Sequence, residues 1–211
     1  MTQTVIATIT QTVIGYYGGM PRWEPDAQLR LETAALDLFA EHGYDGTTVA
    51  DIAQRAGLMQ RSFFRYFPDK REALFGGTDR LLAHLQQQVQ HAPADVAPWR
   101  VLLDALTSSA LLFPQDRGLA RTRQNVIAAN PELREREVLK VLTLHDQLTA
   151  LLAKRGVPQR QAAYLVRLSL TVYEQAFDQW TDPDTDITFE ICMADAAAEL
   201  QRALALGMLG T

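Results

Sequence analysis

The chain has 211 residues, of which 47% are hydrophobic and 21% charged, and its formal net charge is −5. This composition is typical of a folded chain of one or two domains, and it excludes disordered, collagen-like and disulfide-stabilised proteins. No apolar run reaches the roughly 20 residues of a membrane span. The single cysteine, Cys192, indicates a reducing cytoplasm. The negative charge excludes a protein that coats nucleic acid with its whole surface, but not a local basic patch.

The first 19 residues differ from the rest of the chain, because they carry no charged side chain and contain TQTVI twice. Their β-branched residues disfavour a helix, and a secretory signal would need a basic segment that is absent. A short strand, an exposed tail and a translated leader before a functional start at Met20 are the open alternatives. We expect residues 1–24 to form a poorly ordered tail.

An amphipathic helix is predicted within residues 26–44. Apolar side chains recur there at helical spacing: Leu31, Ala35, Leu38 and Phe39. Pro25 suits the start of this helix, and Gly43 suits the left-handed position that follows its end.

Two short helices follow. Thr47 or Thr48 can cap the first of them, which ends at Gly57. The second is predicted over about residues 60–67 and ends at Pro68. Two short helices joined by a glycine turn are the outline of a helix-turn-helix.

Basic residues concentrate in this part of the chain. Between positions 55 and 71, five basic residues stand against one acidic residue. Arg61 and Arg65 are four residues apart and share a helix face, from which they could read guanine in a major groove. Asp69 can cap a fourth helix from Lys70 to about residue 90, and Lys70 could hold a phosphate there.

The stretch AALDLFAEHGYDGTTVADIAQRAGLMQRSFFRYFPDKREAL closely resembles the DNA-binding domain of TetR-family transcriptional regulators. The matching pieces are the LF-x-E-x-G-Y helix end, the Thr-Thr turn, D-I-A-x-x-A-G and Y-F-P-x-K. The resemblance implies an all-α fold. A three-helix DNA-binding domain is expected over residues 25–75, and a helical ligand-binding and dimerisation domain over residues 76–211.

Two positions depart from the family pattern. Met59 stands where the family usually has Ser or Thr, so its side chain cannot cap the next helix. Phe64 stands where the family often has a phosphate-binding Tyr. The segment R-S-F-F-R-Y-F-P also resembles a subset of the family that senses acyl-CoA-like ligands. The residues expected to contact DNA are Thr47, Thr48, Gln60, Arg61, Ser62, Phe64, Arg65, Tyr66 and Lys70.

Proline and glycine breaks predict five further helices, near residues 98–113, 116–129, 131–155, 158–180 and 187–206. The helix over 158–180 is apolar on nearly all sides, which predicts burial on two fronts. TetR-like proteins dimerise through their last two helices, and both of these segments suit that role. The alternative is a core formed within one chain. Cys192 is expected to be a small buried side chain.

A ligand pocket is expected among the middle helices, lined by apolar residues and a few polar ones. The candidate residues are Trp99, Leu102, Leu103, Arg121, Gln124, His145, Tyr173 and Trp180. No catalytic motif and no metal-ligand spacing is found, so we expect no catalytic residue, no cofactor and no metal.

The sequence therefore predicts a cytoplasmic homodimeric repressor. Its partners would be a palindromic double-stranded DNA operator and a small apolar or amphipathic effector, with no membrane partner. The fourth predicted helix, over 70–90, would be the only continuous rigid link between ligand and DNA. The alternative is a helical adaptor or small-molecule-binding protein without sequence-specific DNA binding.

Overall fold

The computed structural model describes residues 27–113 and 117–205, and all regular elements in these ranges are helices. The N-terminal unit is formed by α2 (Ala27–His42), α3 (Val49–Arg55) and α4 (Gln60–Phe63), followed by the 3₁₀ helix η1 (Glu72–Leu74). The remaining elements are α5 (Gly76–His91), α6 (Pro98–Ser108), η2 (Ser109–Leu112), α7 (Arg117–Ala129), α8 (Pro131–Lys154), α9 (Gln159–Thr181) and α10 (Phe189–Ala205). The predicted all-α fold is confirmed. The expected tail and the helix start at Pro25 lie outside the described residues.

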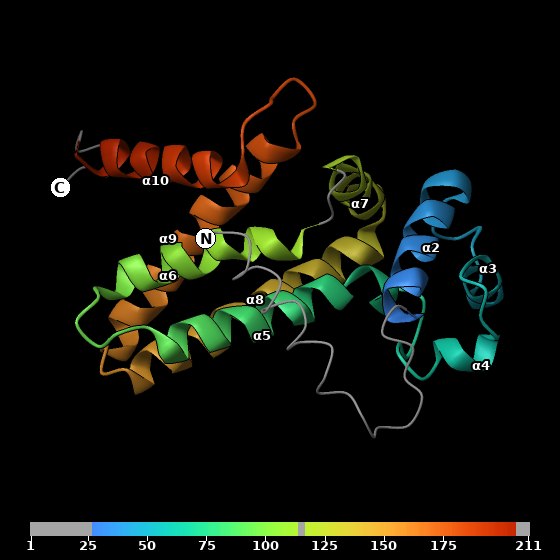
Figure 1. Cartoon of the computed structure of the whole chain (residues 1–211), viewed down its shortest axis with the longest axis horizontal. Coiled ribbons are helices and arrows are strands. Elements are labelled where there is room, and N and C mark those ends of the chain that lie inside the picture. Colours follow the sequence, from blue (N-terminus) through green and yellow to red (C-terminus); the bar gives the residue numbers. More distant parts are fainter. Residues whose placement is uncertain (1–26, 114–116, 206–211) are drawn as a thin grey trace, which may run out of the picture.

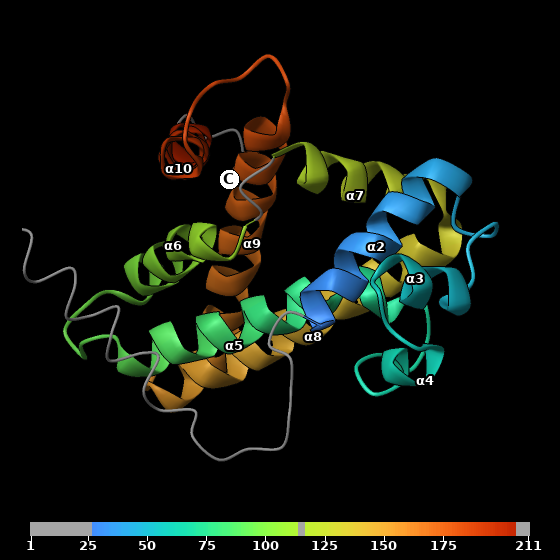
Figure 2. The same ribbon diagram turned by 45° about the vertical axis from the view of Figure 1, so that its right-hand side comes forward.

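The helices are arranged along one long axis (Figures 1 and 2). Helices α2 to α4 gather at one end, and α10 lies toward the other end. Helices α5 and α8 lie side by side along the body, while α9 packs against α6, α7, α8 and α10. Helix α7 packs against α2. In the described part of the chain, no helix combines the length and apolar character that a bilayer crossing requires.

Local signals set most helix ends. Gly43 and Gly57 have φ angles of 77° and 69°, a backbone conformation that favours glycine, and each follows the end of a helix. Thr48, rather than Thr47, caps α3: its hydroxyl oxygen accepts from the backbone N–H of Asp51 at 3.2 Å. The Asp51 carboxylate accepts from the backbone N–H of Thr48 at 2.9 Å, which completes a capping box.

The predicted third and fourth helices are both shorter than expected. Helix α4 ends at Phe63 instead of residue 67, and the chain continues through turns in which the N–H of Tyr66 donates to the carbonyl oxygen of Phe63 at 2.9 Å. The fourth helix is not continuous from Lys70. Asp69 accepts from the backbone N–H groups of Arg71 and Glu72 at 2.9 and 3.2 Å and caps η1, and α5 begins only at Gly76.

The core of the N-terminal unit extends beyond its own helices. Its largest fully buried side chains include Phe63 and Phe75. Val126 and Ile127 of α7 and Leu133 of α8 belong to the same hydrophobic cluster. A domain boundary near residue 75 stays a prediction, and this cluster crosses it.

A second core fills the rest of the molecule. Helix α9 contributes one buried stripe to it: Ala162, Val166, Ser169, Val172, Ala176 and Trp180. The expected burial on two fronts is not seen within a single chain, because other sides of α9 face solvent and Tyr164 is 58% exposed. Cys192 is fully buried, as predicted, and burial raises the pKa of its thiol.

Candidate nucleic-acid interface

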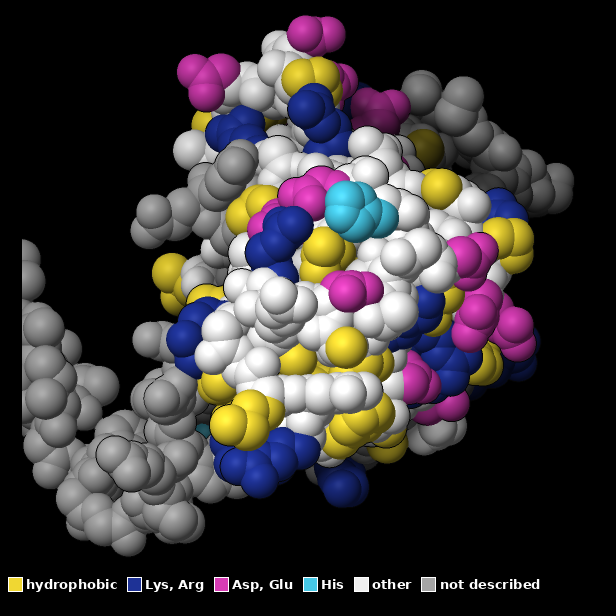
Figure 3. All heavy atoms as spheres, turned by 90° about the vertical axis from the view of Figure 1, so that its right-hand side faces the viewer, with side chains coloured by type: hydrophobic (Ala, Val, Ile, Leu, Met, Phe, Trp, Pro, Cys, Tyr) yellow, Lys and Arg dark blue, Asp and Glu magenta, His cyan; other side chains and the backbone are white. Residues whose placement is uncertain are grey.

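Helix α4 lies at the edge of the unit formed by α2, α3 and α4 (Figure 1). Arg61 lies on this helix, whereas Arg65 lies in the turn that follows it, because α4 ends at Phe63. Figure 3 shows Lys and Arg side chains beside hydrophobic ones along the lower edge of this face of the molecule. Arg61 is exposed and makes no hydrogen bond or ion pair with the residues that the structure describes. Arg65 is also exposed. Its guanidinium donates to the Tyr66 hydroxyl at 3.0 Å and lies 5.2 Å from the centre of the Tyr66 ring.

Buried aromatic side chains anchor α4 to the core. Phe63 and Phe67 are buried, with ring centroids 5.4 Å apart. Phe64, next to Phe63, is 54% exposed. The other expected DNA contacts on α4 are also near the surface, since Gln60 is exposed and Ser62 is half-buried.

Thr47 is misplaced in the predicted DNA-binding set. Its side chain is buried, and its hydroxyl donates to the carbonyl oxygens of Leu38 at 3.1 Å and Gly43 at 2.9 Å. These bonds hold the turn after α2, so the hydroxyl is a structural group. Thr48 is exposed, but its hydroxyl belongs to the capping box of α3.

Lys70 has a role that the sequence did not indicate. Its ammonium donates to the carbonyl oxygens of Tyr44 at 2.7 Å and Thr47 at 3.0 Å, and it lies 4.1 Å from the centre of the Tyr44 ring. Two of the three ammonium donors are therefore used inside the protein. The expected phosphate contact is replaced, in this structure, by a clamp between the segment after α4 and the turn before α3.

Two of the remaining cations are neutralised by carboxylates. Arg55 donates to both carboxylate oxygens of Glu41 at 3.0 and 2.7 Å, which lowers the pKa of Glu41. Arg71 pairs with Asp69 at 2.9 Å and with Glu132 at 3.0 Å. The basic patch predicted from the charge count thus reduces to Arg61 and Arg65.

Known proteins share both this segment and the whole fold. Residues 32–76 match the family model of bacterial regulatory proteins of the tetR family. The chain carries a TetR-family DNA-binding domain. MftR of Mycobacterium tuberculosis, named as a mycofactocin biosynthesis transcriptional regulator, is 28% identical over 155 residues, which cover 68% of this chain and 76% of that protein.

Solved structures extend the likeness over most of the chain. A Syntrophomonas wolfei protein described as a TetR-family transcriptional regulator has a TM-score of 0.63 at 18% identity, covering 90% of this chain and 100% of its own. FadR from Bacillus subtilis, solved in complex with stearoyl-CoA, has a TM-score of 0.56 at 18% identity, covering 82% of this chain and 96% of its own. At this identity, these structures establish a shared fold.

The residues expected to line a ligand pocket lie in different surroundings. Five of them contribute to the second core: Trp99, Leu102, Leu103, Tyr173 and Trp180. Arg121 is exposed, the Gln124 side chain donates to Asp178 at 2.8 Å, and the His145 ring contacts Asp146 at 3.1 Å. The ligand pocket lined by these residues stays a prediction.

An aromatic cluster joins η2, α9 and α10, and sequence reasoning found only two of its five members. Ring centroids lie 4.7 to 6.1 Å apart in it. The members are Phe113, Tyr173, Phe177, Trp180 and Phe189. Burial raises the pKa of Tyr173 to about 12, despite the opposing effect of its hydrogen bond with Ser109. Phe177 could have been found, because it lies on α9 four residues after Tyr173 and three before Trp180. No local spacing connects Phe113 or Phe189 to this helix.

Two surface hollows lie outside the predicted pocket. One of about 550 Å³ lies between α9 and α10, with Gln175 and Glu199 among its lining residues. Another of about 190 Å³ lies between α5 and α8, beside Gln86 and Lys154. None of the predicted ligand-binding residues lines either hollow.

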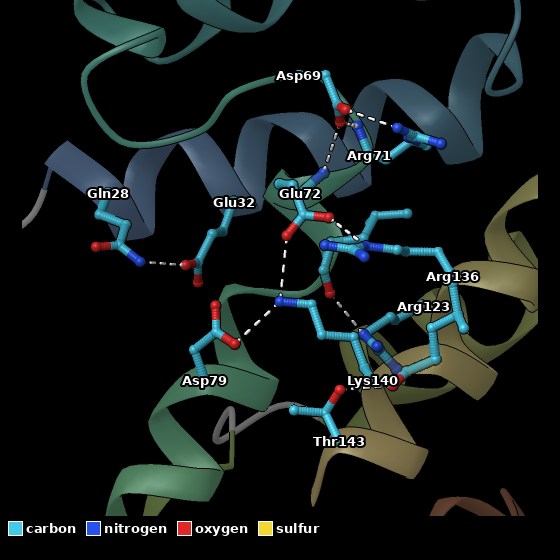
Figure 4. A network of polar contacts seen from close by, with 12 residues as sticks. Gln28, Glu32, Asp69, Arg71, Glu72, Asp79, Arg123, Arg136, Lys140 and Thr143 are labelled. Atoms are coloured by element: carbon cyan, nitrogen blue, oxygen red, sulfur yellow. Dashed lines mark hydrogen bonds and ion pairs between the residues drawn. The ribbon is translucent and has the colours of Figure 1, made fainter.

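Charged residues connect the TetR-family domain to the rest of the chain (Figure 4). Glu72 of η1 accepts from Arg136 of α8 at 2.5 Å and from Lys140 at 3.2 Å, and Lys140 also bonds to Asp79 of α5 at 2.9 Å. Burial would raise the pKa of Glu72, but its bonds with the two cations outweigh that effect and lower it. We call Glu72, Asp79, Arg136 and Lys140 the junction.

The junction corrects the predicted route between the domains. The fourth helix is interrupted at Phe75 and is not the only link, because α8 bonds directly to η1. Arg80 of α5 adds a second contact by donating to both oxygens of Glu32 on α2 at 2.7 Å. Arg123 of α7 adds a third by donating to the carbonyl oxygen of Leu74 at 2.9 Å.

Proposed function

We propose that the protein is a transcriptional repressor that binds a palindromic operator as a homodimer and inserts α4 into the major groove. The observation that carries this function is the exposed guanidinium of Arg61 on α4 together with that of Arg65 in the turn after it, on a segment anchored by the buried rings of Phe63 and Phe67. Arginine pairs bidentately with guanine in the major groove, and the second helix of a helix-turn-helix places such side chains there.

The proposed dimer uses α9 and α10. Three large apolar side chains on these helices are about half exposed in the single chain: Tyr164, Ile191 and Leu204. The hollow between the two helices offers a concave surface beside them. A two-fold pair of chains would cover the same surface on both copies and would set the spacing of two α4 helices on DNA.

The proposed effector is an apolar or amphipathic molecule, with a long-chain acyl-CoA as the first to test. The aromatic cluster and the half-buried Trp99 and Leu103 give an apolar lining, and FadR, which shares the fold, was solved with stearoyl-CoA. Release from DNA requires that the effector bind the non-DNA conformation more tightly, since equal binding to both conformations shifts nothing.

DNA binding is tested by selecting duplexes from a random-sequence library with the full chain and measuring affinity by fluorescence anisotropy. Arg65→Ala should weaken binding of the selected duplex by about 5- to 150-fold, equivalent to about 1–3 kcal/mol. Arg100→Ala is the matched control, because Arg100 is equally exposed but lies on α6. Failure to enrich any duplex over the random pool would refute the proposed function.

Effector binding is tested with stearoyl-CoA on the preformed complex of protein and selected duplex. We expect release from DNA, and we expect Trp180→Ala to abolish the response while leaving DNA affinity without effector unchanged. Tight binding of stearoyl-CoA without any loss of DNA affinity would contradict the repressor mechanism. No binding at all would exclude acyl-CoA as the effector class.

A further inference from the structure

Two large apolar side chains flank Arg61 at the two ends of α4. Met59 is the N-cap residue of α4, and its side chain is 64% exposed. Phe64 is the C-cap residue and is 54% exposed. Neither side chain can neutralise or hydrogen-bond a phosphate as a basic or hydroxyl group would. Their exposure therefore needs an explanation other than backbone binding.

The major groove of DNA contains one apolar group that distinguishes bases, the 5-methyl group of thymine. A recognition helix directs its N-terminal residues at base edges, which is where Met59 and Arg61 lie. We propose that Met59 and Phe64 are specificity-determining residues that recognise thymine methyl groups on either side of the base read by Arg61. This inference rests on the proposed function, because it requires α4 to enter the major groove.

Packing fixes the position of the Phe64 side chain more firmly than that of Met59. The Phe64 ring meets the ring of the fully buried Phe63 edge-on, with centroids 5.7 Å apart and planes at 83°. Such a ring can discriminate sharply between a methyl group and a hydrogen. Met59 has three rotatable side-chain bonds and makes no capping bond, so it can adapt to its neighbour. We therefore expect stricter thymine selection opposite Phe64 than opposite Met59.

The experiment replaces thymine by uracil, which removes the methyl group and keeps base pairing. The probe is the duplex selected in vitro by the full chain, with each thymidine replaced in turn by deoxyuridine. At the thymines read by Met59 or Phe64, we expect about a fourfold loss of affinity per methyl group, equivalent to about 0.8 kcal/mol. Replacement in both half-sites should give a loss of about 15-fold, because the two contacts add.

Variants assign each methyl group to a side chain. Phe64→Ala should bind the thymine and uracil duplexes equally at one position, and Met59→Ala should do so at another. Leu111→Ala is the control, because Leu111 is 85% exposed but lies on η2 and should retain full uracil sensitivity. All three side chains are exposed, and thermal unfolding should show that the variants remain folded.

The outcomes separate this inference from the function on which it rests. A selected duplex without any uracil-sensitive thymine would overturn the inference and leave the DNA-binding function standing. Uracil sensitivity that persists unchanged in both alanine variants would do the same. A gain in affinity for Phe64→Tyr that is equal on both duplexes would assign this position to a phosphate and overturn the inference for Phe64. Failure to select any duplex would overturn both proposals.

Discussion

Glu72 offers the sharpest test of how the two parts of the molecule are joined. Its carboxylate is 12% exposed and binds two cations of α8, Arg136 and Lys140, whose side chains are 35% and 14% exposed. The substitution Glu72→Gln keeps the shape of the side chain and removes its charge. Lys140 would keep Asp79 as a partner, whereas Arg136 would lose its carboxylate.

The expected loss is about 2 kcal/mol in the free energy of unfolding at pH 7. A hydrogen bond to a charged group contributes about 1.5–3 kcal/mol, and breaking one fully buried ion pair costs about 3–5 kcal/mol. The expected loss is smaller than the cost of breaking a fully buried ion pair, because Arg136 remains partly in water and because the amide oxygen introduced by Glu72→Gln still accepts one bond.

Lowering the pH should remove the difference in the free energy of unfolding between the wild-type chain and Glu72→Gln. The bonds from the two cations lower the pKa of Glu72 below its ordinary value of 4.5, so the folded state gains stability from the carboxylate above that pH. This contribution is lost as the pH falls through the lowered pKa. The wild-type chain and Glu72→Gln should therefore converge in stability below about pH 4.5.

Urea unfolding at one fixed protein concentration measures the effect, with stability compared at pH 7 and in steps down to the acid limit. Asp104→Asn is the matched control. It breaks the pair between Asp104 and Arg100 at 2.9 Å, whose side chains are 55% and 69% exposed. That pair should contribute at most about 0.5 kcal/mol. Equal losses in both variants, or a Glu72→Gln loss that does not change with pH, would refute the reasoning.

Three further substitutions test the corrected contacts. Lys70→Met should lower the free energy of unfolding by about 1–2 kcal/mol, because it opens the turn before α3. DNA binding should weaken, but the slope of log affinity against log salt concentration should stay unchanged. A slope that falls by about one unit would indicate that Lys70 contacts a phosphate after all. Gly76→Ala should cost about 1–3 kcal/mol in urea unfolding, since its methyl group would overlap the Glu32 carboxylate held by Arg80; an unchanged midpoint would show that Glu32 moves freely. Tyr173→Phe should cost about 1 kcal/mol in thermal unfolding through its lost bond with Ser109, and a stabilised variant would contradict that bond.

The predictable parts of this fold are those that depend on neighbouring residues. Gly43 and Gly57 end helices because the left-handed conformation is inexpensive for glycine, and both have positive φ angles. Pro98 and Pro131 begin helices because a first helical residue needs no N–H donor. Each of these signals acts within about one helical turn, so the sequence alone locates the helix.

The unpredictable parts depend on residues that are distant in the chain. Glu72 and Arg136 are 64 positions apart, and no spacing rule connects them. The predicted fourth helix failed for the same reason. A helical pattern runs through residues 70–90, but the burial of Phe75 and the close approach of Gly76 to Glu32 on α2 break it.

The basic patch predicted from the count of charged residues is smaller in the structure than in the sequence. Five basic residues stand close together in the sequence, but Arg55 is paired with Glu41 and Arg71 with Glu132, which lie 14 positions before and 61 positions after them. Lys70 is held by backbone carbonyls. Charge along the sequence therefore overestimates the cations that DNA can meet.

A different set of ion pairs, the junction, would give the proposed repressor a route for regulation. Glu72 follows α4 by nine residues, and its two cations lie on α8, which packs against both α5 and α9. A displacement of α8 by a bound effector would thus act on η1 directly, without first bending α5. A coupling free energy of about 1–3 kcal/mol between effector and DNA is typical of such systems. In the proposed repressor, a rearrangement of the junction bonds would supply a coupling free energy of that magnitude.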